Sequence, residues 1–253
     1  NNDVINKSIL SKNTLFKRSI KRVQSNVYEP LPEHKSLIFN IYIKENLDGL
    51  FLETKGHHFP TQGKSLQDEI RYFKRMISEA EEPFINYILY IDKNTKMKHL
   101  INLKRILKKE KANNIYYSIE NNELPFYHKS DRVFGFYLNS ERSEEVGYKS
   151  MNVKLLSENK FVFQKDTLLK AGLKNSIKER IGAKGLSPFI LSYKKDTSFD
   201  DYFAILSLTK EIVNEYRKEY ALKSYGEKYF SLSKPHRNII REKVYWRFFD
   251  VVE

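Results

Sequence analysis

Few residues of this chain belong to the types that carry catalytic or metal chemistry. Cysteine is absent from the 253 residues, which excludes disulfides, thiolate metal sites and cysteine nucleophiles. The histidines follow none of the spacings that build a metal site, and the adjacent pair His57-His58 would rarely direct both rings at one ion. The carboxylate pairs Asp200-Asp201, Glu81-Glu82 and Glu144-Glu145 fall at a helix start or in polar loops, where helix dipole and solubility explain them. We therefore predict a protein that is not an enzyme and that uses no cofactor or metal.

Basic residues are the most prominent polar feature of the chain. Lys and Arg number 45 against 32 Asp and Glu, which gives a formal net charge of +13. This balance is typical of proteins that bind nucleic acid or acidic surfaces, although the codon bias of an AT-rich genome produces the same lysine excess without a ligand. The densest cluster lies on a predicted helix and would either contact anionic groups or form a solvated outer face: Lys98, Lys104, Arg105, Lys108 and Lys109.

Aromatic residues alternate along several predicted strands, which leaves a second hypothesis open. In a single-strand nucleic-acid binder such residues form a stacking platform, whereas in most sheets they fill the core beneath helices. No segment has the order of an RNA-recognition signature, and the nearest, Arg132 to Tyr137, departs from it. The residues concerned are Tyr42, Tyr87, Tyr90, Tyr116 and Tyr117.

The elements that position these residues begin after residue 34. Hydrophobic residues make up 40% of the chain, enough to build a core in one large domain or two small ones. Alternation and β-branched content predict strands over 37–43, 50–53, 84–91 and 115–119, with a turn at Asp48-Gly49. Apolar stripes at helical spacing predict helices over 66–77 and 100–107, so the order is β-β-α-β-α-β.

The second half of the chain repeats this order. Strands are predicted over 151–156, 160–163 and 188–193, a helix over 169–181 capped by Asp166 or Thr167, and a longer helix over 202–220. An additional strand-like segment, 133–138, precedes this unit. The fold class predicted is therefore α+β, with two tandem β-β-α-β-α-β units whose helices pack on one face of small mixed sheets.

Polar residues at matching strand-to-helix junctions are predicted to cap the helices that follow. Ser, Thr, Asp and Asn side chains accept hydrogen bonds from the first N–H groups of a helix, which stabilises it by about 1 kcal/mol. The residues at these junctions are Asp92 and Thr95 in the first unit, and Asp196 and Thr197 in the second.

These patterns predict four segments along the chain. Residues 1–34 are basic and contain Pro30 and Pro32, which indicates a linker or tether; 35–124 and 125–226 form the two domains, and 227–253 a C-terminal extension. No apolar run reaches eighteen residues, so we expect no membrane-spanning segment within this sequence. Because the chain begins at Asn1 rather than Met, we expect a segment upstream of it.

The order of elements and the tail of the second unit resemble the periplasmic domain of the ExbD/TolR family. The run from Ile212 to Tyr229, with Asn214-Glu215 and Ala221, is similar to the helix that extends past the domain in a long-tailed branch of ExbD. Residues 232–243 also resemble that tail, whereas 244–253 have diverged from its terminal motif. The resemblance covers 37–119 and 151–243; the family normally carries one such domain, and its transmembrane helix has no counterpart here.

This resemblance implies a non-enzymatic binding part of a stator or energy-transducing accessory protein of a proton-driven inner-membrane motor. It implies a periplasmic location, with an anchor in the inner membrane upstream of Asn1 that binds an ExbB-like motor subunit. The implied partners are a TonB-like protein, peptidoglycan and other copies of the chain, or an internal pseudo-dimer of the two units, favoured by their covalent linkage. The binding mode expected is strand addition, in which a partner peptide pairs with an exposed edge of a sheet; the sequence does not identify which edge. The alternative is a basic cytoplasmic nucleic-acid-binding protein with ferredoxin-like sheets.

Overall fold

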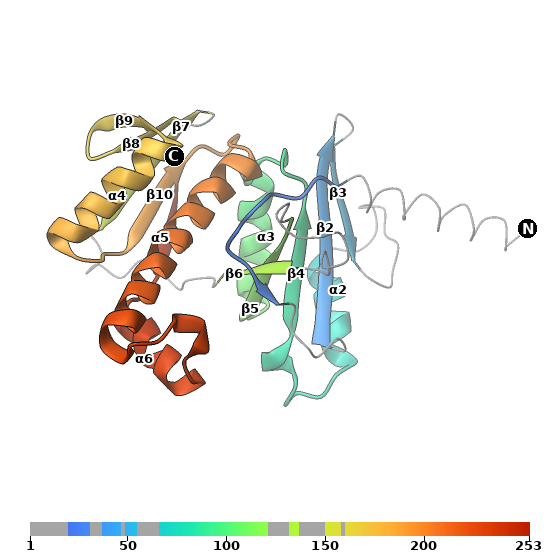
Figure 1. Ribbon diagram of the computed structural model, residues 1–253. Helices are drawn as coiled ribbons and strands as arrows, with labels where there is room; N and C mark the ends of the chain where they lie inside the picture. Colours follow the sequence, from blue (N-terminus) through green and yellow to red (C-terminus); the bar gives the residue numbers. More distant parts are fainter. Residues whose placement is uncertain are drawn as a thin grey trace, which may run out of the picture. The chain divides into compact units, whose positions relative to one another are not determined.

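The computed structural model describes residues 20–30, 37–46, 49–54, 66–120, 132–136, 150–157 and 160–253. These residues form two compact units (Figure 1). The first lies within Asn1–Leu138 and includes Ser198–Asp200; the second lies within Asn139–Thr197 and Asp201–Glu253. Each unit contains one mixed sheet with helices, so the predicted α+β class is confirmed. Within the described residues, none of the helices combines the length and the apolar character needed to cross a membrane.

The first unit is built on a six-stranded sheet. Strands β2, β4 and β5 are parallel to one another, whereas β3 and β6 pair antiparallel with their neighbours. The order across the sheet is β1 (Glu29–Pro30), β6 (Arg132–Phe136), β5 (Asn114–Ile119), β4 (Asn86–Ile91), β2 (Ile38–Asn46) and β3 (Gly49–Thr54). Strands β2 and β3 are consecutive and antiparallel. Helix α2 (Leu66–Arg75) follows β3 and leads to β4, and α3 (Met97–Lys109) leads from β4 to β5.

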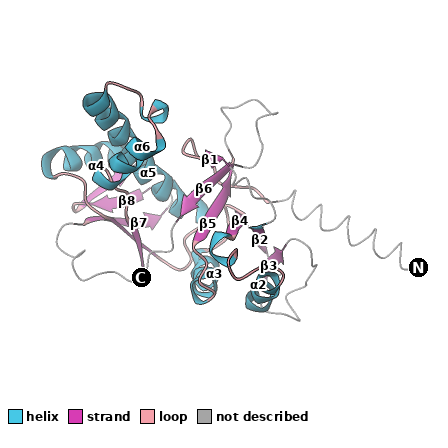
Figure 2. Ribbon diagram, turned by 90° about the horizontal axis from the view of Figure 1, so that it is seen from below, coloured by secondary structure: helices cyan, strands magenta, loops and turns pink. Residues whose placement is uncertain are grey.

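Both connecting helices of the first unit cover the same face of its sheet, as Figure 2 shows. The chain moves in one direction across the sheet from β2 to β4 to β5, and right-handed crossovers in one direction place their helices on one face. The core follows from strand alternation and the helical stripe, because both direct apolar side chains into the space between sheet and helices. Its buried members include Phe39, Ile41, Ile43, Leu89, Ile91, Leu100, Leu103 and Leu107.

The segment before the first sheet contributes to this unit, which corrects part of the linker predicted for residues 1–34. Ile20 and Val23 are buried, the N–H of Lys93 donates to the carbonyl of Lys21 (2.8 Å), and the N–H of Glu120 donates to the carbonyl of Val23 (2.9 Å). Strand β1 then pairs with β6. Residues 1–19 and 31–34 of the predicted linker lie outside the described residues.

The second unit contains a five-stranded sheet. Its order is β11 (Phe248–Val252), β10 (Phe189–Tyr193), β7 (Met151–Ser157), β8 (Lys160–Phe163) and β9 (Asp166–Leu169). Strand β10 is parallel to both β7 and β11, and the strands β7, β8 and β9 form antiparallel pairs. Its helical elements are α4 (Lys170–Lys184), α5 (Phe199–Tyr225) from Asp201 onward, the short η5 (Tyr229–Ser231) and α6 (Lys234–Lys243).

Two predicted boundaries differ from the structure because strands distant in sequence pair with one another. The segment 132–136, predicted to open the second domain at 125, is β6 and pairs with β5 of the first sheet. Residues 227–253, predicted as an extension, are part of the second unit, since β11 pairs with β10 along five residues. The helices before β11 are held by a small core of Ala221, Tyr229, Leu232 and Ile240.

Strand β9 replaces a predicted helix start. Asp166 and Thr167 do not cap α4; they continue the chain from β8 through a tight turn and pair with it. The turn consists of Gln164 and Lys165, whose φ angles are 53° and 78°. Positive φ at both central residues is the mark of a type I′ hairpin turn, a conformation that glycine and asparagine adopt at lower cost than other residues.

Replacing Gln164 by asparagine and Lys165 by glycine is expected to raise the free energy of unfolding by about 1–2 kcal/mol, because the left-handed backbone then carries less steric strain. Urea denaturation of the Gln164→Asn/Lys165→Gly variant measures the gain. The matched control is Lys165→Ala, which retains the β-carbon and should give no comparable gain. A double variant no more stable than the unmodified chain would contradict this account of the turn.

Candidate functional site

The predicted basic face is present on α3, but it does not form one site. Lys98, Arg105, Lys108 and Lys109 are exposed, and Lys104 is half-buried. The Nζ of Lys98 lies 3.4 Å from the Oε1 of Glu45, and Arg105 donates to the side chain of Asn102 (3.2 Å). Of the five predicted residues, Lys109 is the one that lines a cavity described here.

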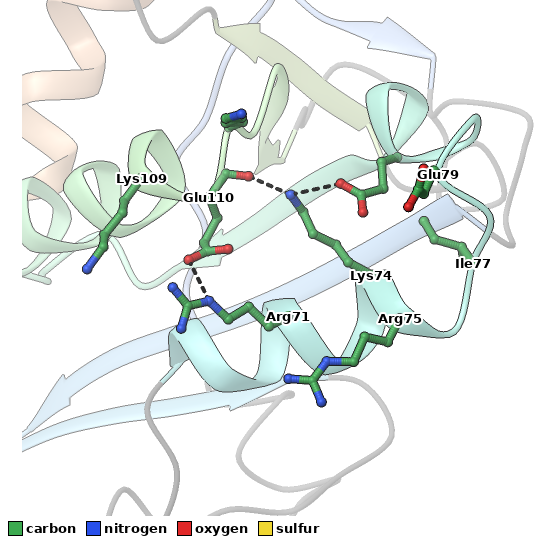
Figure 3. A pocket seen from close by; sticks show the side chains of 9 residues that line it. Arg71, Lys74, Arg75, Ile77, Glu79, Lys109 and Glu110 are labelled. Atoms are coloured by element: carbon green, nitrogen blue, oxygen red, sulfur yellow. Dashed lines mark hydrogen bonds and ion pairs between the residues drawn. The ribbon is translucent and has the colours of Figure 1, made fainter.

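That cavity, of about 630 Å³, lies in the first unit where α2 and α3 end (Figure 3). Helix α2 supplies Arg71, Lys74 and Arg75, spaced so that all three project from neighbouring positions on the helix surface. The remaining lining residues come from the end of α3 and from the segment after α2: Lys109, Glu110, Lys111, Ile77, Glu79 and Glu82.

A buried carboxylate, Glu110, joins the two helices at this cavity. Its side chain is 8% exposed and accepts hydrogen bonds from Arg71 Nε (3.1 Å) and from the side-chain amide of Gln67. Lys74 Nζ donates to the Glu110 carbonyl (2.7 Å) and lies 3.3 Å from a carboxylate oxygen of Glu82, as the dashed lines of Figure 3 show. These contacts fix the ends of α2 and α3 relative to one another.

Three cations at the cavity have no ion pair among the residues that the structure describes: Arg75, Lys109 and Lys111. The lining contains five basic and three acidic side chains, and Arg71 and Lys74 are already engaged with Glu110 and Glu82. Such a surface attracts anionic groups, and it also complements the carbonyl ends of the two helices. We did not predict the contribution of α2, although its basic residues at 71, 74 and 75 were a visible signal.

The predicted caps Asp92 and Thr95 do not cap α3. The Asp92 side chain binds other backbone groups, and the Thr95 hydroxyl binds none. The residue at the helix start is Lys96, and it forms no side-chain cap. Asp92 is buried and accepts the N–H groups of Asn94 (3.0 Å) and Lys21 (3.0 Å), so it holds the turn and the N-terminal segment. Thr95 is fully buried, and its hydroxyl has no hydrogen-bond partner among the described residues.

Replacing Thr95 by valine is therefore expected to leave stability unchanged or to raise it by up to about 1 kcal/mol, since an unpaired buried hydroxyl is removed. A helix cap would respond in the opposite direction, with a loss of about 1 kcal/mol. Thermal denaturation of Thr95→Val distinguishes the two signs. Thr95→Ser, which keeps the hydroxyl and loses the methyl group, is the control and should be less stable than the valine variant.

Instead, the side chain of Glu45 on β2 binds the backbone at the start of α3. One carboxylate oxygen accepts the N–H of Lys96 (3.0 Å), and the other lies 3.1 Å from Nε2 of His99. Burial opposes ionisation of Glu45, but the Lys96 N–H and the nearby His99 and Lys98 outweigh this effect and lower its pKa.

Because this pKa is lower in the folded protein than the ordinary value of 4.5, ionised Glu45 stabilises the fold above that pH. The contribution is expected to be lost as the pH falls below 4.5 and through the lowered pKa. Unfolding measured between about pH 7 and 3 should show a shallower acid-side decline in Glu45→Gln than in the unmodified chain. Glu179→Gln on α4 is the control, and equal slopes in Glu45→Gln and the unmodified chain would contradict the assignment.

The second pair of predicted caps lies before α5. Asp196 is exposed and Thr197 half-buried, and α5 begins at Phe199, two residues beyond Thr197. The N–H of Thr197 donates to the carbonyl of Lys194 (3.1 Å), which closes the turn after β10. Neither side chain forms a hydrogen bond with another residue in the described part of the chain. These residues therefore form a turn and do not cap the helix.

The aromatic residues predicted along the strands occupy two environments. Tyr87 and Tyr117 are buried in the core, where they cannot stack on a ligand. Burial raises the pKa of the Tyr87 hydroxyl, as do the nearby carboxylates of Glu82 and Glu110. Tyr42, Tyr90 and Tyr116 are half-buried, and the rings of Tyr42 and Tyr90 stack on each other with their centroids 4.5 Å apart.

No group of three or more His, Asp or Glu side chains that could hold a metal ion occurs among the described residues. His34, His57, His58 and His128 lie outside them. No protein-family model matches this sequence, and no curated protein or solved structure matches it.

Proposed function

We propose that this chain is the non-enzymatic, periplasmic binding part of an accessory protein that resembles ExbD and TolR. In this role it would be anchored in the inner membrane by a segment upstream of Asn1 and would contact an ExbB-like motor subunit there. Its two units would bind a TonB-like protein segment, peptidoglycan or other copies of the chain.

The observation that supports this proposal is the arrangement of strands in each sheet. In the first unit the order β3-β2-β4-β5 results from a hairpin followed by two helices, each leading to a parallel strand one position further along. In the second unit β8-β7-β10-β11 has the same strand order and directions, although β9 follows the hairpin and α5, η5 and α6 together precede β11. This is the element order on which the resemblance rests, and a binding role is compatible with a fold that serves many functions.

The cavity between α2 and α3 supplies a surface for such binding. Its cations Arg75, Lys109 and Lys111 suit an acidic segment of a partner, and rim charges of this kind raise association rates and set specificity. We expect the triple change to glutamine to weaken partner binding more than the same change at Lys184, Lys195 and Lys228, which are exposed lysines of the second unit.

The location is tested with the full-length gene product carrying a C-terminal tag. After membrane fractionation, spheroplasts are treated with a protease, with a cytoplasmic marker and a detergent-lysed sample as controls. Membrane association together with loss of the tag in intact spheroplasts supports the proposal. A protein that fractionates as soluble and is cleaved only after lysis would overturn it.

The same basic cavity also favours the alternative, a nucleic-acid-binding protein, because clustered Arg and Lys neutralise phosphates. The buried and mutually stacked tyrosines argue against a stacking platform on the sheet. Binding of a labelled single-stranded oligonucleotide that weakens steeply between about 50 and 200 mM salt, as expected for several phosphate contacts, would favour this alternative. Binding to an acidic peptide, with no measurable binding of the oligonucleotide at the same salt concentration, would favour the first.

A further inference from the structure

A second cavity, of about 300 Å³, lies entirely within the second unit. It is bounded by β7, by the turn between β8 and β9, and by the last third of α4. Its polar lining includes Asn152, Gln164, Lys165, Arg180 and Ser192, and its apolar lining includes Val153 and Phe163. None of the described residues that line it carries a carboxylate.

Arg180 is the residue that distinguishes this cavity. One terminal nitrogen of its guanidinium, Nη1, is shielded from solvent and has no hydrogen-bond partner among the described residues. Nη1 itself lies out of reach of a ligand in the cavity, but Arg180 as a whole is half-buried, so its remaining guanidinium nitrogens are the donors that such a ligand meets. A guanidinium is also the side chain best suited to bind a carboxylate or phosphate through two parallel hydrogen bonds.

The other charges at the cavity add to its positive potential. Lys165 lies on the hairpin turn, is exposed, and has no ion pair among the described residues. Lys154 also lines the cavity, but its Nζ is 2.8 Å from a carboxylate oxygen of Glu253 and is thereby compensated. Within the described part of the chain, Arg180 and Lys165 are therefore the two lining cations whose charge is left without a counterpart.

We propose that this cavity binds a small ligand through an oxyanion group, a carboxylate or a phosphate, that pairs with Arg180 and is approached by Lys165. The volume lies at the lower end of the range for small-molecule sites, which admits a ligand of modest size. The side-chain amides of Asn152 and Gln164 and the hydroxyl of Ser192 are further hydrogen-bonding groups for it, and Val153 contributes an apolar surface. This inference is independent of the proposed periplasmic role.

The test is titration of the full chain by calorimetry and by two-dimensional NMR with inorganic phosphate, and separately with succinate and acetate. Saturable binding is expected, with shifts at Arg180, Lys165 and the backbone of β7. Arg180→Gln should weaken it by about tenfold or more, because a charge-assisted pair is lost. Lys165→Asn, which tolerates the turn conformation, should weaken it several-fold, and Lys184→Gln, an exposed lysine on the same helix as Arg180, should not alter it.

Preference for phosphate over the carboxylates would identify a phosphate-bearing ligand, and the reverse a carboxylate; either supports the site. Arg180→Lys supplies a second variant that keeps the charge and should bind with intermediate affinity, in case Arg180→Gln does not fold. No saturable binding at tens of millimolar anion would mean that water alone fills the cavity, and would overturn the proposal. Equal affinity in Arg180→Gln and the unmodified chain would overturn it as well.

Discussion

Replacement of Phe248 by alanine is expected to lower the free energy of unfolding by about 3–5 kcal/mol. Phe248 opens β11 and is only 3% exposed. Its ring packs edge-on against Tyr202 of α5, with centroids 6.3 Å apart, and lies 6.0 Å from the ring of Trp246. Removing a buried aromatic side chain loses its apolar burial and leaves a cavity that the surroundings fill only in part.

The control for this prediction lies on the same strand. Val252 is 37% exposed, so Val252→Ala is expected to change stability by less than about 1 kcal/mol. Guanidinium denaturation followed by tyrosine and tryptophan fluorescence and by circular dichroism measures both variants. A loss below about 1 kcal/mol for Phe248→Ala would mean that the C-terminal residues are an extension without a role in the second sheet, as the sequence pattern had suggested.

Glu110→Ala is expected to have the second-largest effect, a loss of about 2–3 kcal/mol. The carboxylate is buried, and its removal leaves Gln67 without an acceptor and Arg71 without its ion pair. Hydrogen bonds to a charged partner contribute more than neutral ones, and the groups left behind must be rehydrated in a partly closed site. Since Gln67 and Arg71 lie on α2, the variant should loosen this helix in particular.

A double-mutant cycle isolates this interaction. We expect Glu110→Ala and Arg71→Ala to be less than additive, with a coupling energy of about 1 kcal/mol or more, because they remove the same contact. Glu79→Ala, an exposed carboxylate at the same cavity, is the matched control and should be close to neutral. Hydrogen exchange would locate the loss, with faster exchange expected in α2. Fully additive effects of Glu110→Ala and Arg71→Ala would contradict the role assigned to Glu110.

Several elements were predictable because their signals lie in neighbouring residues. The strand predicted over 160–163 is β8, that over 115–119 lies within β5, and Leu100, Leu103 and Leu107 of the predicted helix stripe are all buried in α3. Alternating and helical spacing of apolar residues show which face of a strand or helix is buried. This can be read without knowing which element packs against that face. β9 was missed for a local reason: its turn uses Gln164 and Lys165, which carry no hairpin signal, and Asp166-Thr167 is typical of a helix start.

The composition and the spacing of apolar residues were enough to predict an α+β protein and most of its strands and helices, because burial periodicity is written into short stretches of chain. Which segments meet was decided only by tertiary structure. Asp92 binds the N–H of Lys21, 71 residues away, instead of capping the adjacent helix, and β11 joins β10 across the whole of α5 and α6. Arg71 reaches Glu110 over 39 residues, and Arg180 lines the same cavity as the turn at Lys165. Such contacts depend on which distant residues the folded chain brings within hydrogen-bond distance. The pattern of neighbouring residues does not predict those pairings.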